Sequence, residues 1–102
     1  MDVRLLYFDD CPNWRLAATR LNEVLGAMGD PGPVVTYELV STPEQAERVG
    51  FRGSPTILVE GRDPFAGPDD PIGLSCRLYR GPAGVEHAPT VEQLRSVLAD
   101  AR

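Results

Sequence analysis

A short apolar run near the N-terminus changes abruptly into a helical pattern, and this junction constrains the fold more than any other feature. The run, residues 3–8, stops at the adjacent carboxylates Asp9 and Asp10. A short apolar segment with such a polar end is typical of a buried strand. A helix is expected over residues 12–28, where apolar residues recur at helical spacing behind Pro12, which needs no amide hydrogen at a first helical position. The chain therefore begins as a strand followed directly by a helix.

The rest of the chain predicts a mixed α/β fold. Thr42–Gln45 and Thr90–Gln93 have capping-box spacing, in which the first and last side chains cap each other's backbone, so each marks a helix start. Further strands are expected at 34–40, 56–59 and 76–80, a return arm at 85–87, and helices at 43–49 and 91–101. The order β-α-β-α-β-β-α predicts a single domain, residues 1–102, with a four-stranded mixed sheet flanked by helices and a right-handed first crossover.

Composition and charge limit the class of partner. The net charge is −5, and all 10 basic residues are arginines scattered without a basic run, so a nucleic-acid partner is not expected. No stretch approaches the ~18 apolar residues of a membrane span, and the first apolar run is too short for a signal-peptide core. We therefore expect a cytoplasmic protein with no membrane partner. Its two cysteines start as thiols in that compartment, and no feature of the sequence indicates an oligomeric state.

Cys11 is the main candidate for chemistry. It directly follows the first strand and opens the first helix, where free backbone amides and the positive end of the helix dipole favour a thiolate. Asp9 and Asp10 act against this effect, because nearby negative charge disfavours the thiolate. The pKa of the Cys11 thiol is thus expected to be lowered only modestly. The alternative is a buried cysteine with no chemical role.

A second element, Gly53-Ser54-Pro55-Thr56, precedes the third expected strand. Together with the strand-Cys11-Pro12-helix junction, it resembles the thioredoxin family along almost the whole chain. The resemblance implies that the Ser54–Pro55 peptide bond is cis, and that Cys11 and Pro55 are neighbours and form the catalytic pair. The pocket implied around them consists of Asp10, Pro12, Asn13, Trp14, Ser54 and Thr56.

Two further segments are similar to a small bacterial subgroup of thioredoxin-like proteins. They are Gly-Arg-Asp-Pro-Phe at 61–65 and Ser-Cys-Arg-Leu-Tyr at 75–79. Some members of that subgroup carry a label that links them to alkylmercury lyases.

Trp14 stands where the family's Cys-x-x-Cys motif has its second cysteine. Cys11 is therefore expected to form mixed disulfides, but no second thiol of the motif is present to release them by intramolecular attack. Trp14 itself is expected to pack on the core or to rim the pocket.

Cys76 is the other cysteine of the chain. At the start of a fourth strand parallel to the first, it would lie four or five residues below Cys11, about 13–17 Å away. A disulfide needs Cα atoms only ~4.4–6.8 Å apart, so we expect a packed or loop thiol. If the long loop 61–75 makes the fourth strand begin later in the chain, Cys76 instead lies close enough to Cys11 to act as the resolving thiol. Cys11 is expected to be the more reactive thiol, with mixed-disulfide formation intact after Cys76→Ser.

Three functions stay open. The first is monothiol exchange through Cys11 with a partner protein or a small thiol such as glutathione or mycothiol. The second is a thioredoxin-fold binding module without chemistry, because a fold alone does not establish activity. The third is organomercurial cleavage or soft-metal binding by Cys11, Cys76 and Asp10, because two thiolates suit a soft metal.

Neither the histidine nor the acidic loop predicts a metal site. His87, the one histidine, is expected at the surface or in a capping position, and nothing in the sequence places it near Cys11. Asp63, Asp69 and Asp70 lack the spacing of a calcium loop and are expected on a solvated loop. No metal and no other cofactor is therefore expected.

Overall fold

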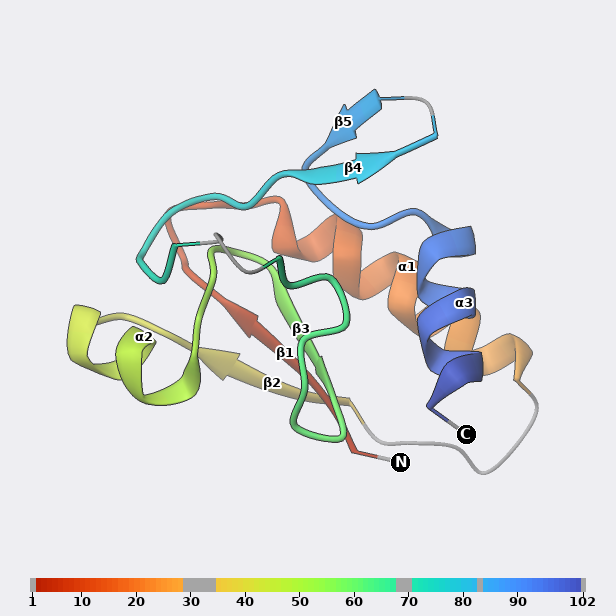
Figure 1. The fold of residues 1–102 in the computed structure, drawn as a ribbon, viewed down its shortest axis with the longest axis horizontal. Helices are drawn as coiled ribbons and strands as arrows, with labels where there is room; N and C mark the ends of the chain where they lie inside the picture. The colour runs from red at the N-terminus through yellow and green to blue at the C-terminus, as the bar shows by residue number, and fades with distance from the viewer. Residues whose placement is uncertain (1, 29–34, 68–70, 83, 102) are drawn as a thin grey trace.

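The computed structural model, which describes residues 2–28, 35–67, 71–82 and 84–101, has the mixed α/β arrangement drawn in Figure 1. Its elements are β1 (Val3–Tyr7), α1 (Trp14–Ala27), β2 (Val35–Leu39), α2 (Pro43–Val49), β3 (Thr56–Val59), β4 (Tyr79–Gly81), β5 (Gly84–Glu86) and α3 (Val91–Asp100). The order is the expected one, with the expected return arm present as a further strand, β5. Val34, the first residue of the expected second strand, lies outside the described residues.

β1 is the central strand of a three-stranded sheet with the order β2-β1-β3. It runs parallel to β2 and antiparallel to β3. In the described part of the chain, β4 is not the fourth strand of this sheet but pairs with β5 in a separate hairpin. The expected four-stranded sheet is therefore wrong. The residues ahead of β4 run beside the loop that precedes β3, so β4 begins away from the edge of the sheet (Figure 1).

Both faces of β1 carry buried side chains, with Arg4 as the exposed exception, and alternate side chains of a strand point to opposite faces. Val3 and Leu5 belong to an apolar cluster with residues of α1 and α3. Leu6 belongs to a second cluster, which includes Ala46 of α2 and Phe51. α1 and α3 thus cover one face of the sheet and α2 the other, which explains why β1 reads as an almost continuous apolar run.

Both predicted capping sites start helices. Thr42 accepts a hydrogen bond from the Gln45 backbone (3.1 Å), and Pro43 is the first residue of α2. At α3 the capping box is complete, because Gln93 also accepts from the Thr90 amide (2.9 Å). Caps of this kind contribute about 1 kcal/mol each. None of the helices in the described ranges has both the length and the apolar character needed to cross a bilayer.

Candidate functional site

The candidate site lies beyond the carboxyl end of β1, where the chain turns into α1. The Cys11 amide donates to the carbonyl of Phe8 (3.0 Å), which closes a tight turn and sets Cys11 just ahead of the helix. β3 begins at the same end of the sheet because it runs antiparallel to β1. The residues directly before β3, Ser54 and Pro55, are therefore brought to Cys11.

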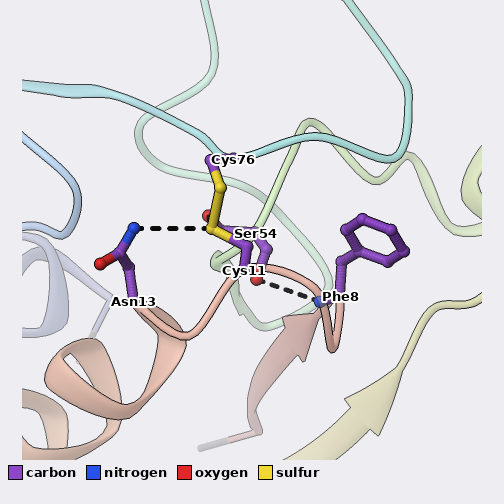
Figure 2. The surroundings of a disulfide bond; sticks show 5 residues. All are labelled: Phe8, Cys11, Asn13, Ser54 and Cys76. Atoms are coloured by element: carbon purple, nitrogen blue, oxygen red, sulfur yellow. Dashed lines mark hydrogen bonds between the residues drawn. A yellow bond between two sulfur atoms is a disulfide. The ribbon is translucent and has the colours of Figure 1, made fainter.

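The Ser54–Pro55 peptide bond is cis, as the family resemblance implies. The carbonyl oxygen of this peptide lies 3.8 Å from the Cys11 sulfur. The Ser54 hydroxyl accepts a hydrogen bond from the Phe8 amide (3.0 Å), which ties the loop to the end of β1 (Figure 2). The expectations of a cis bond and of its contact with Cys11 are both confirmed.

Cys11 is joined to Cys76 by a disulfide, with a Cα–Cα distance of 5.7 Å (Figure 2). This corrects the expectation that the two cysteines lie too far apart to bond. The error came from placing Cys76 at the start of the fourth strand. β4 begins at Tyr79, and Cys76 lies ahead of it at the level of Ser54. Neither cysteine of the chain is free in this structure.

The docked segment, residues 73–77, carries Cys76 along the loop that precedes β3. Ser54 and Cys76 form a parallel β-bridge. Three backbone hydrogen bonds hold the segment: Gly73 N to Phe51 O (3.0 Å), Ser54 N to Ser75 O (2.7 Å) and Arg77 N to Ser54 O (2.9 Å). Cys76 is therefore positioned by backbone pairing as well as by the disulfide itself.

A buried ion pair anchors the docked segment directly after Cys76. Arg77 donates two hydrogen bonds to the Asp63 carboxylate (2.6 and 3.4 Å), with side chains 6% and 2% exposed. Asp63 also accepts from the Phe65 amide (2.9 Å), and the guanidinium lies 4.7 Å from the ring centre of Tyr79. The expectation of a solvated Asp63 was wrong, because this aspartate neutralises a buried arginine. Asp69 and Asp70 lie outside the described residues.

The two sulfur-bearing residues differ in exposure. Cys11 is buried, with 1% of its surface exposed, whereas Cys76 is exposed to solvent. The side-chain amide of Asn13 donates to the Cys11 sulfur (3.5 Å) and makes no helix-capping bond. A thiolate formed at Cys11 would therefore have a hydrogen-bond donor beside it and α1 directly after it, both of which favour negative charge.

Trp14 has a packing role. Its ring stacks on Tyr7 at a centroid distance of 4.4 Å and meets Tyr37 edge-on at 6.4 Å. It packs against the apolar cluster formed with α1 and α3. The expectation that Trp14 packs on the core is confirmed.

Of the other predicted pocket residues, one is buried with a structural role and two are exposed to solvent. Thr56 is buried, donates to Gly53 (2.7 Å) and accepts from the Arg52 amide (3.2 Å), so it shapes the turn before β3. Asp10 and Pro12 are exposed. His87 is exposed, as expected, and no group of three potential metal ligands occurs within the described ranges.

The sequence did not indicate the roles of two residues that hold Cys76 in place, Gly53 and Arg77. Gly53 has a φ of +103°, and a Cβ there would lie 3.0 Å from the Arg77 Cβ. Its only signal is a glycine ahead of a Ser-Pro turn. Arg77 lies in the segment 75–79 that resembles the bacterial subgroup, but no local pattern pairs it with Asp63, which is 14 residues away.

Comparison of the chain with protein-family models, with curated proteins and with solved structures finds no match. The function is therefore inferred from the site's own geometry.

Proposed function

We propose that this chain is a thioredoxin-like thiol–disulfide exchange protein in which Cys11 and Cys76 form the redox couple. The observation that carries the proposal is the disulfide between a cysteine at a strand–helix junction and a cysteine on a segment paired with the cis-proline loop. A purely monothiol mechanism is not proposed, because the structure supplies a second sulfur. The thioredoxin topology is part of the proposal and is supported by the element order and the cis bond.

The exposures of the two cysteines suggest different roles. An external thiolate reaches Cys76, because Cys11 is buried. A new bond then forms to the Cys76 sulfur, the Cys11–Cys76 bond breaks, and Cys11 leaves as a thiolate. A second external thiolate releases Cys76, so two external thiols become one external disulfide while the protein gains two thiols. In the reverse direction, Cys11 attacks a mixed disulfide on Cys76 and resolves it.

The test is the intact mass of the full chain after reduction and brief treatment with oxidised glutathione. The native protein should return to the internal disulfide with no lasting adduct. Cys11→Ser should keep a glutathione adduct on Cys76, because nothing resolves it. Cys76→Ser should take up glutathione more slowly than Cys11→Ser, because its remaining thiol is buried, which reverses the order of reactivity expected from the sequence.

Two results would count against the proposal. A native protein that keeps a glutathione adduct would restore the monothiol mechanism. A disulfide that dithiothreitol cannot reduce in the folded chain would be a structural crosslink, and the binding-module interpretation would then replace the redox one.

The proximity of the two sulfurs also favours a second candidate function, which is the binding of a soft metal ion by the reduced protein. Two thiolates at one place are the ligands that such a metal prefers. Tight Hg(II) binding by the reduced native chain, lost in both Cys11→Ser and Cys76→Ser, would support it. Release of mercury from an organomercurial, lost in Asp10→Asn, would extend it to the cleavage reaction.

A further inference from the structure

A cavity of about 460 Å³ opens beside Cys76. This volume lies within the ordinary range for small-ligand sites. Cys76 is among the residues that line it, and Cys11 is not. Phe65 and Tyr79 supply aromatic wall, and their rings meet edge to face at 5.3 Å. A molecule seated in the cavity is thus next to the exposed cysteine of the disulfide.

Arginine is the only kind of charged side chain that lines this cavity in the described part of the chain. Arg52, Arg77 and Arg80 all line it. They are three of the 10 basic residues in a chain whose net charge is −5, so the clustering is not a property of the surface as a whole.

Two of these arginines are not neutralised by a carboxylate within the described ranges. Arg77 pairs with Asp63, as described above. Among the described residues Arg52 and Arg80 have no such partner. Arg52 is half-buried and Arg80 is exposed, and both line the cavity, so they supply positive charge that a ligand carboxylate would neutralise.

From this arrangement we infer that the cavity binds a small thiol or disulfide carrying a carboxylate, with the carboxylate held by Arg52 and Arg80 and the sulfur directed to Cys76. The inference rests on the proposed exchange reaction and names its substrate class. The bound thiolate attacks Cys76, its sulfur becomes bonded to Cys76, and Cys11 leaves as a thiolate. A second molecule of the same thiol completes the reduction and departs as the symmetrical disulfide.

The probes are N-acetylcysteine and its neutral amide, with glutathione as a larger anionic thiol. The measured quantity is the rate at which each thiol reduces the oxidised full chain. It is followed through the appearance of free thiols on the protein. The two N-acetylcysteine probes differ in charge and in intrinsic thiol reactivity. Each variant is therefore compared with the native chain using the same thiol, so that intrinsic reactivity cancels.

The variants are Arg52→Gln and Arg80→Gln, with Arg48→Gln as the matched control. Arg48 is an exposed arginine on α2 and does not line the cavity. An exposed or half-exposed charge pair contributes up to about a fivefold change in rate. We expect each cavity variant to slow N-acetylcysteine and glutathione by about that factor, with the neutral amide unchanged and the control unaffected. Added salt should weaken the preference of the native chain for the anionic thiols.

Residues 68–70 connect two lining residues, Gly67 and Pro71, and include Asp69 and Asp70. The double variant Asp69→Asn, Asp70→Asn therefore belongs in the same series. Since it removes only negative charge, the preference for anionic thiols should persist or increase.

Equal slowing of charged and neutral thiols in Arg52→Gln and Arg80→Gln, or no slowing of either, would overturn the inference of an anionic substrate while the exchange reaction stands. Failure of every thiol to reduce the native disulfide would instead overturn the proposed function. The two failures are therefore distinguishable in one set of measurements.

Discussion

Ser54 and Cys76 are partners in a parallel β-bridge, and this backbone pairing places Cys76 within bonding distance of Cys11. The bridge belongs to a docked segment that is also fixed by a buried ion pair and by a close approach to Gly53. The position of the second sulfur thus depends on residues that are not themselves part of the disulfide.

Asp63→Asn should destabilise the reduced protein by about 3 kcal/mol, because it removes a buried negative charge that is paired with the buried Arg77. It should also slow reformation of the disulfide, since Arg77 adjoins Cys76. Urea unfolding in dithiothreitol measures the first effect, and the rate of thiol loss after removal of the reductant measures the second. The control is Glu92→Gln, which breaks the exposed pair with Arg95 and should change stability by less than ~0.5 kcal/mol. Equal effects of the two substitutions would show that the buried pair has no special role.

Gly53→Ala should destabilise the fold by about 1–3 kcal/mol, because a non-glycine residue is strained at a φ of +103°. The added methyl group also presses on Arg77 and on the carbonyl of Ser75, at 3.0 and 3.2 Å. Gly26→Ala is the matched control in α1, where nothing lies within 4 Å of the new Cβ. It should stabilise the protein by about 0.5–1 kcal/mol. Denaturant unfolding of both variants checks the opposite signs, and a neutral Gly53→Ala would argue against the close approach.

Asn13→Ala should slow reduction of the disulfide by about fivefold, because a hydrogen bond to a charged leaving group is worth more than a neutral one. Its amide donates to the Cys11 sulfur at 3.5 Å and makes no cap bond, so the stability of α1 should not change. The control is Asn22→Ala, which removes an amide bonded to the Tyr37 hydroxyl. Reduction by dithiothreitol under pseudo-first-order conditions gives the two rates. An unchanged rate in Asn13→Ala would mean that helix α1 alone stabilises the departing thiolate.

Reduction of the disulfide should lower the free energy of unfolding by about 4 kcal/mol, the loop-closure contribution for cysteines separated by 65 residues. The comparison is urea unfolding with and without dithiothreitol. The double variant Cys11→Ser, Cys76→Ser should unfold identically in both conditions. A difference of less than ~1 kcal/mol in the native chain would show that the unfolded chain gains little freedom when the bond is cut.

The sequence predicted the framework well because local signals marked it. The apolar run of β1, the Thr-led caps and the Ser54–Pro55 turn each depend on a few adjacent residues. Cys76 was misplaced because its position depends on contacts that no local pattern encodes: the pairing with Ser54 and the ion pair of Arg77 with Asp63. The hairpin of β4 was assigned to the main sheet for the same reason.

Both backbone hydrogen-bonding groups of Ser54 are already used by the protein's own chain, the amide by Ser75 and the carbonyl by Arg77. While the docked segment stays in place, a second polypeptide has no backbone group at Ser54 with which to form a strand. A protein substrate would have to displace this segment, whereas a small molecule needs only to reach Cys76. Pairing of a second chain at Ser54 therefore requires that residues 73–77 first give up their own hydrogen bonds to this residue.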